Sequence, residues 1–389
     1  RRPMRTTVHF PAGTLQSSAP SGFICFVRSR IWLGAMTLPG PGSGLVFGYP
    51  VFGLKSWEEK CQKKLHIILK YSLLRSDFTT NSFLILMHNF QVQVAKLVDI
   101  FKTLFKDRVD RAGNFQNYPN KPLVSDLEIL AIGSVAECFQ INSENHLFVR
   151  LDNEAPGYLR ARISRPRFHC RRKRLQVFME DALSLARSHF SPHERLFIVD
   201  SKPVPICRLG RIPRLKICKE NPTIRPQLAT CFAKNERYYG FKIHLITTQK
   251  GLPVSFSLTG AKTHDVRAFE QMMDHSELKK VDIIGDKGYV SNPLQLNLFE
   301  NKEVSLKAQP RVNMRTPHNW TPKMAIIRKT IEVVFSQTED QFRICQNFAK
   351  TLEGLIVRIT HKLVGLLFCQ LSNIQNNRNV SSVKSALFA

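Results

Sequence analysis

Between residues 87 and 190, the order of hydrophobic and polar positions predicts helices. From Gln91 to Phe105 apolar residues recur at helical spacing. The run Ser125–Glu128 has the pattern of a capping box and predicts a helix through Cys138. Ile141–Val149 predicts a turn into another helix, and Leu175–Phe190 predicts one more. The two short helices between residues 125 and 149 resemble a helix-turn-helix, although many helical pairs share this pattern.

After residue 190 the pattern changes to short apolar runs that predict the strands of one sheet. A hairpin turn is expected at Gln249–Gly251, and Thr263–Asp265 is expected to cap a helix that runs to Met273. The alternation in the second strand places Lys242 and His244 on its exposed side, where DNA contact or plain solvation is possible. A mixed α/β sheet, rather than an all-parallel one, is the expected fold. The predicted strands cover residues 195–200, 238–246, 252–258 and 281–285.

The two ends of the chain lack such patterns. Residues 1–86 contain Gly- and Pro-rich stretches, and we interpret them as an irregular extension upstream of a natural start near Met87. Within it, Ile31–Leu54 is uncharged and long enough to span a membrane, but its Gly and Pro residues make a poor helix, so no membrane partner is expected. The polar tail 372–389 is expected to be mobile. The remaining predicted domains are 87–190, helical and basic, and 191–371, catalytic.

The charge balance points to a polyanionic partner. The chain has 57 Lys and Arg against 30 Asp and Glu, a formal net charge of +27. Nucleic acid is the first expectation and an acidic membrane the second. The segment Arg160–Arg174 holds eight basic residues in fifteen and no acid, which favours phosphate contacts over a solvated linker. The candidate DNA-binding residues in it are Arg165, Arg167, Arg171, Arg172, Lys173 and Arg174.

The nine cysteines are scattered, and their number is odd. No pair has the C-x2-C spacing of a metal site, although Cys207 and Cys218 with nearby histidines leave a zinc site conceivable. Reduced thiols in a cytoplasmic protein are the better interpretation.

Three acidic residues carry the candidate chemistry. Asp200 and Asp286 each follow a short apolar strand, and Glu332 lies on an amphipathic helix. Converging carboxylates can hold two hard cations about 4 Å apart, which neutralise the attacking and leaving oxygens of a phosphodiester. Each residue also has a structural interpretation, because aspartates cap turns and Glu332 is four residues after Arg328, as in a helical ion pair.

Several motifs in one order resemble the DDE transposases of bacterial insertion sequences, with the insertion-sequence-982 family as the best match. The resemblance runs from about Met87 to the end of the chain. The motifs are Ile198-Val-Asp200-Ser201 with Pro205-Ile-Cys207, Tyr239-Gly-Phe-Lys-Ile-His244, Gly285-Asp-Lys-Gly-Tyr289 and Arg328-Lys-Thr-Ile-Glu332-Val-Val-Phe-Ser336, with Ser125-Asp-Leu-Glu128 and Arg171-Arg-Lys-Arg-Leu175 further upstream.

The resemblance implies a ribonuclease H-like catalytic domain in which Asp200, Asp286 and Glu332 are the catalytic, metal-binding triad. The implied cofactor is Mg²⁺, as two ions that Mn²⁺ can replace. The implied reaction is hydrolysis at the element ends, followed by attack of the freed 3′ hydroxyl on target DNA. The implied partner is double-stranded DNA, bound by a dimer or larger assembly in the bacterial cytoplasm at the nucleoid. A nuclease of the same fold and an inactive DNA-binding descendant remain alternatives.

Residues beside the triad are secondary candidates. Lys287 and Arg328 are expected either to contact phosphate or to neutralise the neighbouring acids. His264-Asp265 is similar to a motif of related transposases, although helix capping also explains Asp265. Tyr289 is expected to be a packing aromatic rather than a nucleophile.

Overall fold

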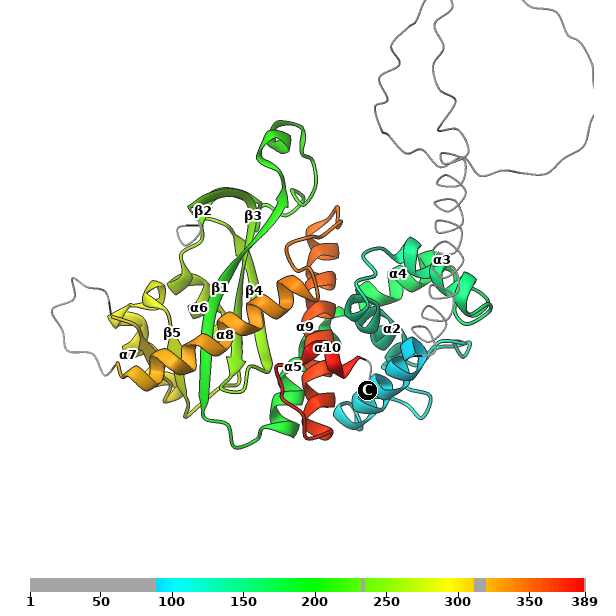
Figure 1. The fold of residues 1–389 in the computed structure, drawn as a ribbon, viewed down its shortest axis with the longest axis horizontal. Coiled ribbons are helices and arrows are strands. Elements are labelled where there is room, and N and C mark those ends of the chain that lie inside the picture. Colours follow the sequence, from blue (N-terminus) through cyan, green and yellow to red (C-terminus); the bar gives the residue numbers. More distant parts are fainter. Residues whose placement is uncertain (1–88, 232–234, 311–319, 388–389) are drawn as a thin grey trace, which may run out of the picture. The chain divides into compact units, whose positions relative to one another are not determined.

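The computed structural model describes residues 89–231, 235–310 and 320–387, all within one compact unit that begins at Ile68 (Figure 1). Residues 89–104 are helical. The further helices are α2 (Asp126–Cys138), α3 (Glu144–Glu154), α4 (Arg165–Arg174), α5 (Gln176–Phe190), α6 (Asp265–Asp274), α7 (Asn292–Lys302), α8 (Pro322–Asp340), α9 (Leu352–Gln375) and α10 (Val383–Ala386), with short 3-10 helices η1 (Leu209–Arg214) and η2 (Lys287–Tyr289).

The strands form one mixed sheet, as the sequence predicted. In the order β4-β3-β1-β5-β6, the first three strands are antiparallel neighbours and β5 and β6 run parallel to β1. The short strand β2 pairs with the first half of β3, beyond the end of β4. The strands are β1 (Leu196–Cys207), β2 (Gln227–Cys231), β3 (Glu236–Thr248), β4 (Pro253–Gly260), β5 (Asp282–Gly285) and β6 (Ser305–Ala308).

Helices cover both faces of the sheet, and each face has its own core. Successive strand residues point to opposite faces, so Ile198 packs in the core shared with α5, α8 and α9, whereas Phe197 and Val199 pack in the core shared with α6 and α7. The first of these cores continues without a break into the helical part, because it also contains Phe90 and Leu130. The change of secondary structure at residue 190 is therefore not a boundary between separate cores.

Strand β1 is longer than the sequence predicted, which corrects the position of Asp200. The prediction placed Asp200 at the end of a strand, but β1 continues seven residues further, to Cys207. Pro203 and Pro205 lack the backbone N–H that a ladder hydrogen bond needs. They are tolerated because β5 pairs only with residues up to Val199, which leaves that edge of β1 unpaired beyond this point.

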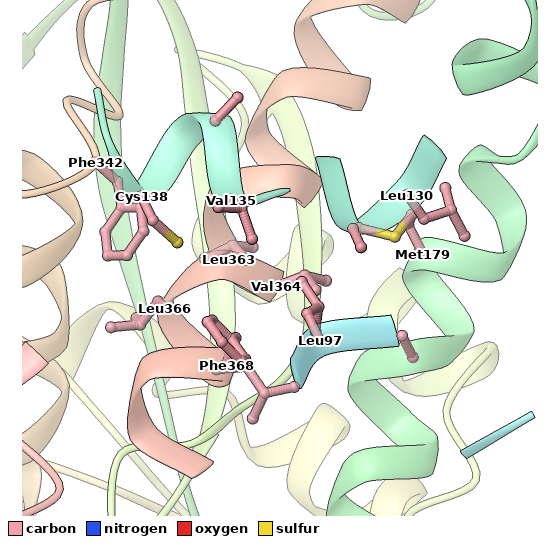
Figure 2. Packing of buried hydrophobic residues seen from close by; sticks show 14 of the residues in the cluster. Leu97, Leu130, Val135, Cys138, Met179, Phe342, Leu363, Val364, Leu366 and Phe368 are labelled. Atoms are coloured by element: carbon pink, nitrogen blue, oxygen red, sulfur yellow. The ribbon is translucent and has the colours of Figure 1, made fainter. Parts of the chain in front are cut away.

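The helical part is organised around α9, which follows the sheet in the chain. Helix α2 begins with the predicted capping box: Ser125 Oγ accepts from the Glu128 N–H, and the Glu128 carboxylate accepts from the Ser125 N–H. Figure 2 shows the side chains that interlock in this core from the helix at 89–104, α2, α5 and α9. The labelled residues are Leu97, Leu130, Val135, Cys138, Met179, Phe342, Leu363, Val364, Leu366 and Phe368.

The predicted polar tail is part of this packing. Helix α9 crosses the predicted boundary at residue 371 and ends at Gln375. Asn373 is buried, and its side-chain amide donates to the backbone carbonyl of Ser382 over 3.0 Å. Val383 and Leu387 are buried as well. A segment with few apolar residues is thus held by a polar side chain of the core and by two apolar anchors.

Buried charges join α2 to α9. Glu137 on α2 is 2% exposed, and its carboxylate oxygens lie 2.8 Å from both the Arg358 guanidinium and the Lys362 ammonium of α9. Lys362 is fully buried, and this burial lowers its pKa, while Glu137 raises it. Two cations therefore depend on one buried carboxylate.

Helices α2 and α9 lie close together at Gly133, and this packing yields a stability prediction. A Cβ added to Gly133 would lie 2.6 Å from His361 Cε1 and 2.9 Å from His361 Nδ1. We expect Gly133→Ala to lower the free energy of unfolding by about 1–3 kcal/mol despite the better helix propensity of alanine. Urea unfolding measures the change. Gly210→Ala is the control, since a Cβ there meets nothing within 4 Å, and an equal loss in both variants would contradict the prediction.

In the described part of the chain no helix is long and apolar enough to span a membrane. The predictions for residues 1–86, including the Ile31–Leu54 segment and the start near Met87, fall outside the described residues.

Candidate active site

The register of two neighbouring strands brings Asp200 and Asp286 together. The last parallel pair between β1 and β5 is Val199 with Gly285. The next residue on each strand is an aspartate, and neighbouring strands lie about 4.8 Å apart. Asp286 follows the end of β5 and is the N-terminal cap residue of η2. Both aspartates line an open cleft of about 1050 Å³.

Helix α8 adds Glu332 to the same cleft. The helix contacts β1 and β5 and buries Ile331, Val334 and Phe335 on one face. Glu332 lies beside this buried face, and its side chain is 51% exposed where it lines the cleft. The three predicted residues come from β1, the end of β5 and α8, so one cavity collects carboxylates that are 86 and 46 residues apart in the chain.

Arg328 links two of the three carboxylates. Its guanidinium lies 2.5 Å from Glu332 Oε1 and 3.7 Å from Asp200 Oδ2. The helical ion pair considered for Glu332 is therefore present, and it forms inside the cleft. Among the described residues no group of three or more His, Cys, Asp or Glu side chains is close enough to hold a metal ion.

Asp200 has an unusual electrostatic environment. Burial raises its pKa to about 7, and the charges of Asp286 and Asp265 raise it as well, while the Ser201 N–H and Arg328 act in the opposite direction. The Ser201 N–H donates to Asp200 Oδ1 over 2.7 Å. A carboxyl group is thus kept in a place where a cation would relieve the cost of its negative charge.

A fourth carboxylate, Asp265, lies at the cleft and was missed as a site residue by sequence reasoning. The cap of α6 is the side chain of the preceding His264, not that of Asp265. Asp265 Oδ1 instead accepts from Lys242 Nζ over 2.9 Å and from Ser201 Oγ over 3.1 Å. A capping aspartate and a cleft aspartate have the same sequence pattern, so no signal in the sequence separates them.

The prediction that His244 faces solvent is wrong. Helix α6 and its neighbours cover that face of the sheet, and His244 is fully buried, with Nε2 3.0 Å from Thr259 Oγ1 and Nδ1 3.7 Å from Asp265 Oδ1. Burial lowers its pKa to about 4, as does the nearby charge of Lys242, while Asp265 raises it. Tyr289 is buried and packs edge-on against Phe269 with 5.6 Å between ring centroids, in agreement with the predicted packing role.

The predicted DNA-binding residues of α4 fall into two groups. Arg171 and Arg172 are only 8% and 7% exposed, and acids from other segments pair with them: Asp126 at 2.5 Å and Glu144 at 3.4 Å. The segment has no acid of its own, so sequence reasoning could not foresee these partners. We exclude both residues from the proposed DNA surface.

The other basic candidates remain near the surface. Lys173 is 2.5 Å from the carboxylate of Glu353. The three residues Arg165, Arg167 and Arg174 are exposed. Lys287 is also exposed, next to Asp286, whereas Arg328 lies within the cleft as described above.

The sheet domain is similar to one known protein family. Residues 191–368 match the family model described as the transposase DDE domain. This part of the chain is similar to a transposase DDE domain. The match contains all four carboxylates of the cleft, Asp200, Asp265, Asp286 and Glu332. The match names neither the insertion-sequence-982 family nor a bacterial source.

Solved structures give weaker likenesses to the chain. A piggyBac transposase synaptic complex with hairpin DNA is 12% identical and covers 78% of each chain, with a TM-score of 0.37. A pre-cleavage Mos1 transpososome is 11% identical over 66% of this chain and 82% of the other, with a TM-score of 0.19. At these TM-scores the likenesses establish neither fold nor function. No curated protein gives a significant match.

The oxygen donors of the cleft fit hard divalent cations such as Mg²⁺. Asp200, Asp286 and Glu332 supply only carboxylate oxygens, and the raised pKa of Asp200 shows that its negative charge lacks full compensation. Arg328 supplies part of that compensation. The chemistry of these donors suits a divalent metal, but among the described residues the carboxylates are not close enough together to hold one in this structure.

Proposed function

We propose that this protein is a transposase that cleaves DNA at the ends of an insertion sequence and joins the freed 3′ ends to target DNA. The observation that carries the proposal is the convergence of Asp200, Asp286 and Glu332 on one cleft of a transposase DDE domain. The charge of +27 supports DNA as the partner. The proposal includes a ribonuclease H-like fold for the sheet, kinship with the insertion-sequence-982 family, and a dimer or larger assembly that pairs two ends.

The proposed roles follow from the contacts of each residue. Asp200, Asp286 and Glu332 would hold two Mg²⁺ ions, or Mn²⁺ in their place; such ions, when bound, activate the attacking oxygen and stabilise the leaving one. Arg328, once released from Asp200, can reach a phosphate oxygen of DNA in the cleft. The Ser201 N–H orients Asp200 by its hydrogen bond.

DNA would reach the cleft along the basic surface. In the helical part, the proposed contacts are the exposed Arg165, Arg167 and Arg174, together with Lys173, which pairs with Glu353 of α9. In the sheet domain, Lys287 is proposed to contact phosphate beside Asp286. Such contacts position the duplex without reading its sequence. The sequence of the element ends that the protein recognises is not part of the proposal.

A strand-joining reaction tests the proposed function. The full chain is incubated with Mn²⁺ or Mg²⁺, a supercoiled target and DNA carrying the sequences that flank its own gene. End-joined products that disappear with Asp200→Asn support a transposase. Cutting without joining indicates a metal-dependent nuclease instead, and DNA binding with neither product indicates an inactive descendant.

The pKa of Asp200 predicts how metal binding depends on pH. Because burial raises this pKa to about 7, the folded protein keeps the proton that a metal must displace as long as the pH is below 7. The apparent affinity for Mg²⁺ is therefore expected to fall by up to about tenfold per pH unit below pH 7 and to level off above pH 8. Isothermal titration calorimetry between pH 5.5 and 8.5 measures this. A constant affinity over that range would contradict the assignment of Asp200 as a ligand.

A further inference from the structure

An exposed loop between β1 and β2, which we call the basic arm (residues 208–225), has a strong positive charge. It holds six basic residues and one acid, Glu220. Figure 1 shows it projecting beyond the end of the sheet, with η1 near its tip. The six basic residues are Arg208, Arg211, Arg214, Lys216, Lys219 and Arg225, and all six are exposed.

In the part of the chain that the structure describes, no carboxylate pairs with these charges. None of the six basic residues of the arm is in an ion pair with a carboxylate of the described residues. The carboxylate of Glu220 is occupied elsewhere, because it accepts from the backbone N–H of Leu352 at the start of α9. This differs from α4, where acids of other segments pair with Arg171 and Arg172.

The basic arm is fastened to the rest of the protein. The Cys218 N–H donates to the Lys350 carbonyl over 2.9 Å, and the Cys218 side chain is buried. Glu220 adds the contact with Leu352. The ends of the arm continue into β1 and β2, which are both held by β3. Its charges are therefore presented from a fixed base, which lowers the entropic cost of binding a partner.

The basic arm borders the cleft at the far end of β1 from the sheet's β3–β4 turn. Pro203 on β1 and residues 228–231 of β2 line the cleft, so the arm borders it. Asp200 and Cys207 are seven residues apart on β1, roughly 23 Å at about 3.3 Å per residue. With a rise of about 3.4 Å per base pair, this distance corresponds to about seven base pairs of DNA.

We infer that the basic arm is a second DNA-binding surface, which grips the phosphate backbone of the duplex about seven base pairs from the position of cleavage. The inference rests on the proposed function for the identity of the partner. Its contacts are with phosphates, so it contributes affinity and orientation for any sequence rather than recognition of a particular one.

Binding of a 30-base-pair duplex of arbitrary sequence tests the inference. The variant Arg211→Gln/Arg214→Gln removes two exposed charges of the arm. The matched control, Lys250→Gln/Lys279→Gln, removes two exposed charges elsewhere; Lys250 lies in the β3–β4 turn, at the opposite end of β1 from the arm. We expect the arm variant to reduce the slope of log affinity against log salt by about 2 and to weaken binding at 0.15 M salt on the order of tenfold, with the control unchanged.

Other outcomes separate failure of the inference from failure of the proposed function. Wild-type protein that does not bind the duplex would contradict the proposed function and the inference together. If the wild type binds the duplex and the arm variant binds it equally well, with the same salt slope, the inference is overturned but the proposed function is not. A variant that binds the duplex normally but loses binding to duplex RNA, or loses self-association in sedimentation without DNA, would also overturn it in favour of that partner. On DNA that the wild type cleaves, loss of hydroxyl-radical protection about seven base pairs from the cut would support it.

Discussion

Asp286→Asn is expected to lower the rate of DNA cleavage by at least about 10³-fold. The substitution keeps the size of the side chain but removes one of the charges that the proposed metal ions require. Loss of about 4 kcal/mol of transition-state stabilisation corresponds to this factor. Asp200→Asn and Glu332→Gln are expected to have similar effects. DNA binding should be largely spared, because the exposed basic residues are unchanged.

The matched control for this prediction is Asp282→Asn. Asp282 lies on β5, the strand that ends just before Asp286. Its carboxylate pairs with Lys307 at 2.7 Å and does not line the cleft. Its cleavage rate should stay within a few-fold of wild type. Cleavage rates come from gel assays in Mn²⁺, and duplex affinities from fluorescence anisotropy. Normal cleavage by Asp286→Asn would remove this residue from the site.

Glu137→Gln is expected to lower the free energy of unfolding by about 3–5 kcal/mol. The substitution leaves the Arg358 and Lys362 cations buried without their shared carboxylate, and removal of one partner of a buried ion pair has a cost of this size. The free energy is measured by urea unfolding at pH 7, with the same slope in denaturant assumed for both proteins.

Asp99→Asn is the control for the buried network. Asp99 pairs with Lys102 on the helix at 89–104, where both side chains are more than half exposed. Such pairs contribute little, so a change below about 0.5 kcal/mol is expected. If Glu137→Gln changed the free energy of unfolding as little as Asp99→Asn does, the buried charges would not fix α2 against α9 as described.

Local patterns in the sequence were sufficient to predict four of the six described strands and the main acids. The apolar runs that end before Asp200 and Asp286 and the capping box at Ser125 depend on neighbouring residues, and the structure contains these elements. Strands β2 and β6 and helices α4, α7, α9 and α10 were not predicted. The β2 sequence, Gln227–Cys231, has little apolar character because only one of its edges pairs, with β3.

Contacts between distant segments could not be predicted. The partners of Arg171 and Arg172 are 45 and 28 residues away in the chain, and Asp265 meets Lys242 only because α6 folds over β3. The charge count of the basic arm was visible in the sequence, but its exposure and its place beside the cleft depend on the unexpected length of β1. In each case the missing information was which segments of the chain lie together in the folded protein.

Direct counting of bound Mn²⁺ tests whether Asp200, Asp286 and Glu332 act together as a metal site. Free Mn²⁺ is measured by electron paramagnetic resonance during titration of the full chain with a 30-base-pair duplex. The variant Asp200→Asn/Glu332→Gln with the same duplex accounts for ions held by the DNA itself. We predict that wild type binds two more Mn²⁺ ions per chain than this variant does. Equal binding by the two proteins would contradict the account.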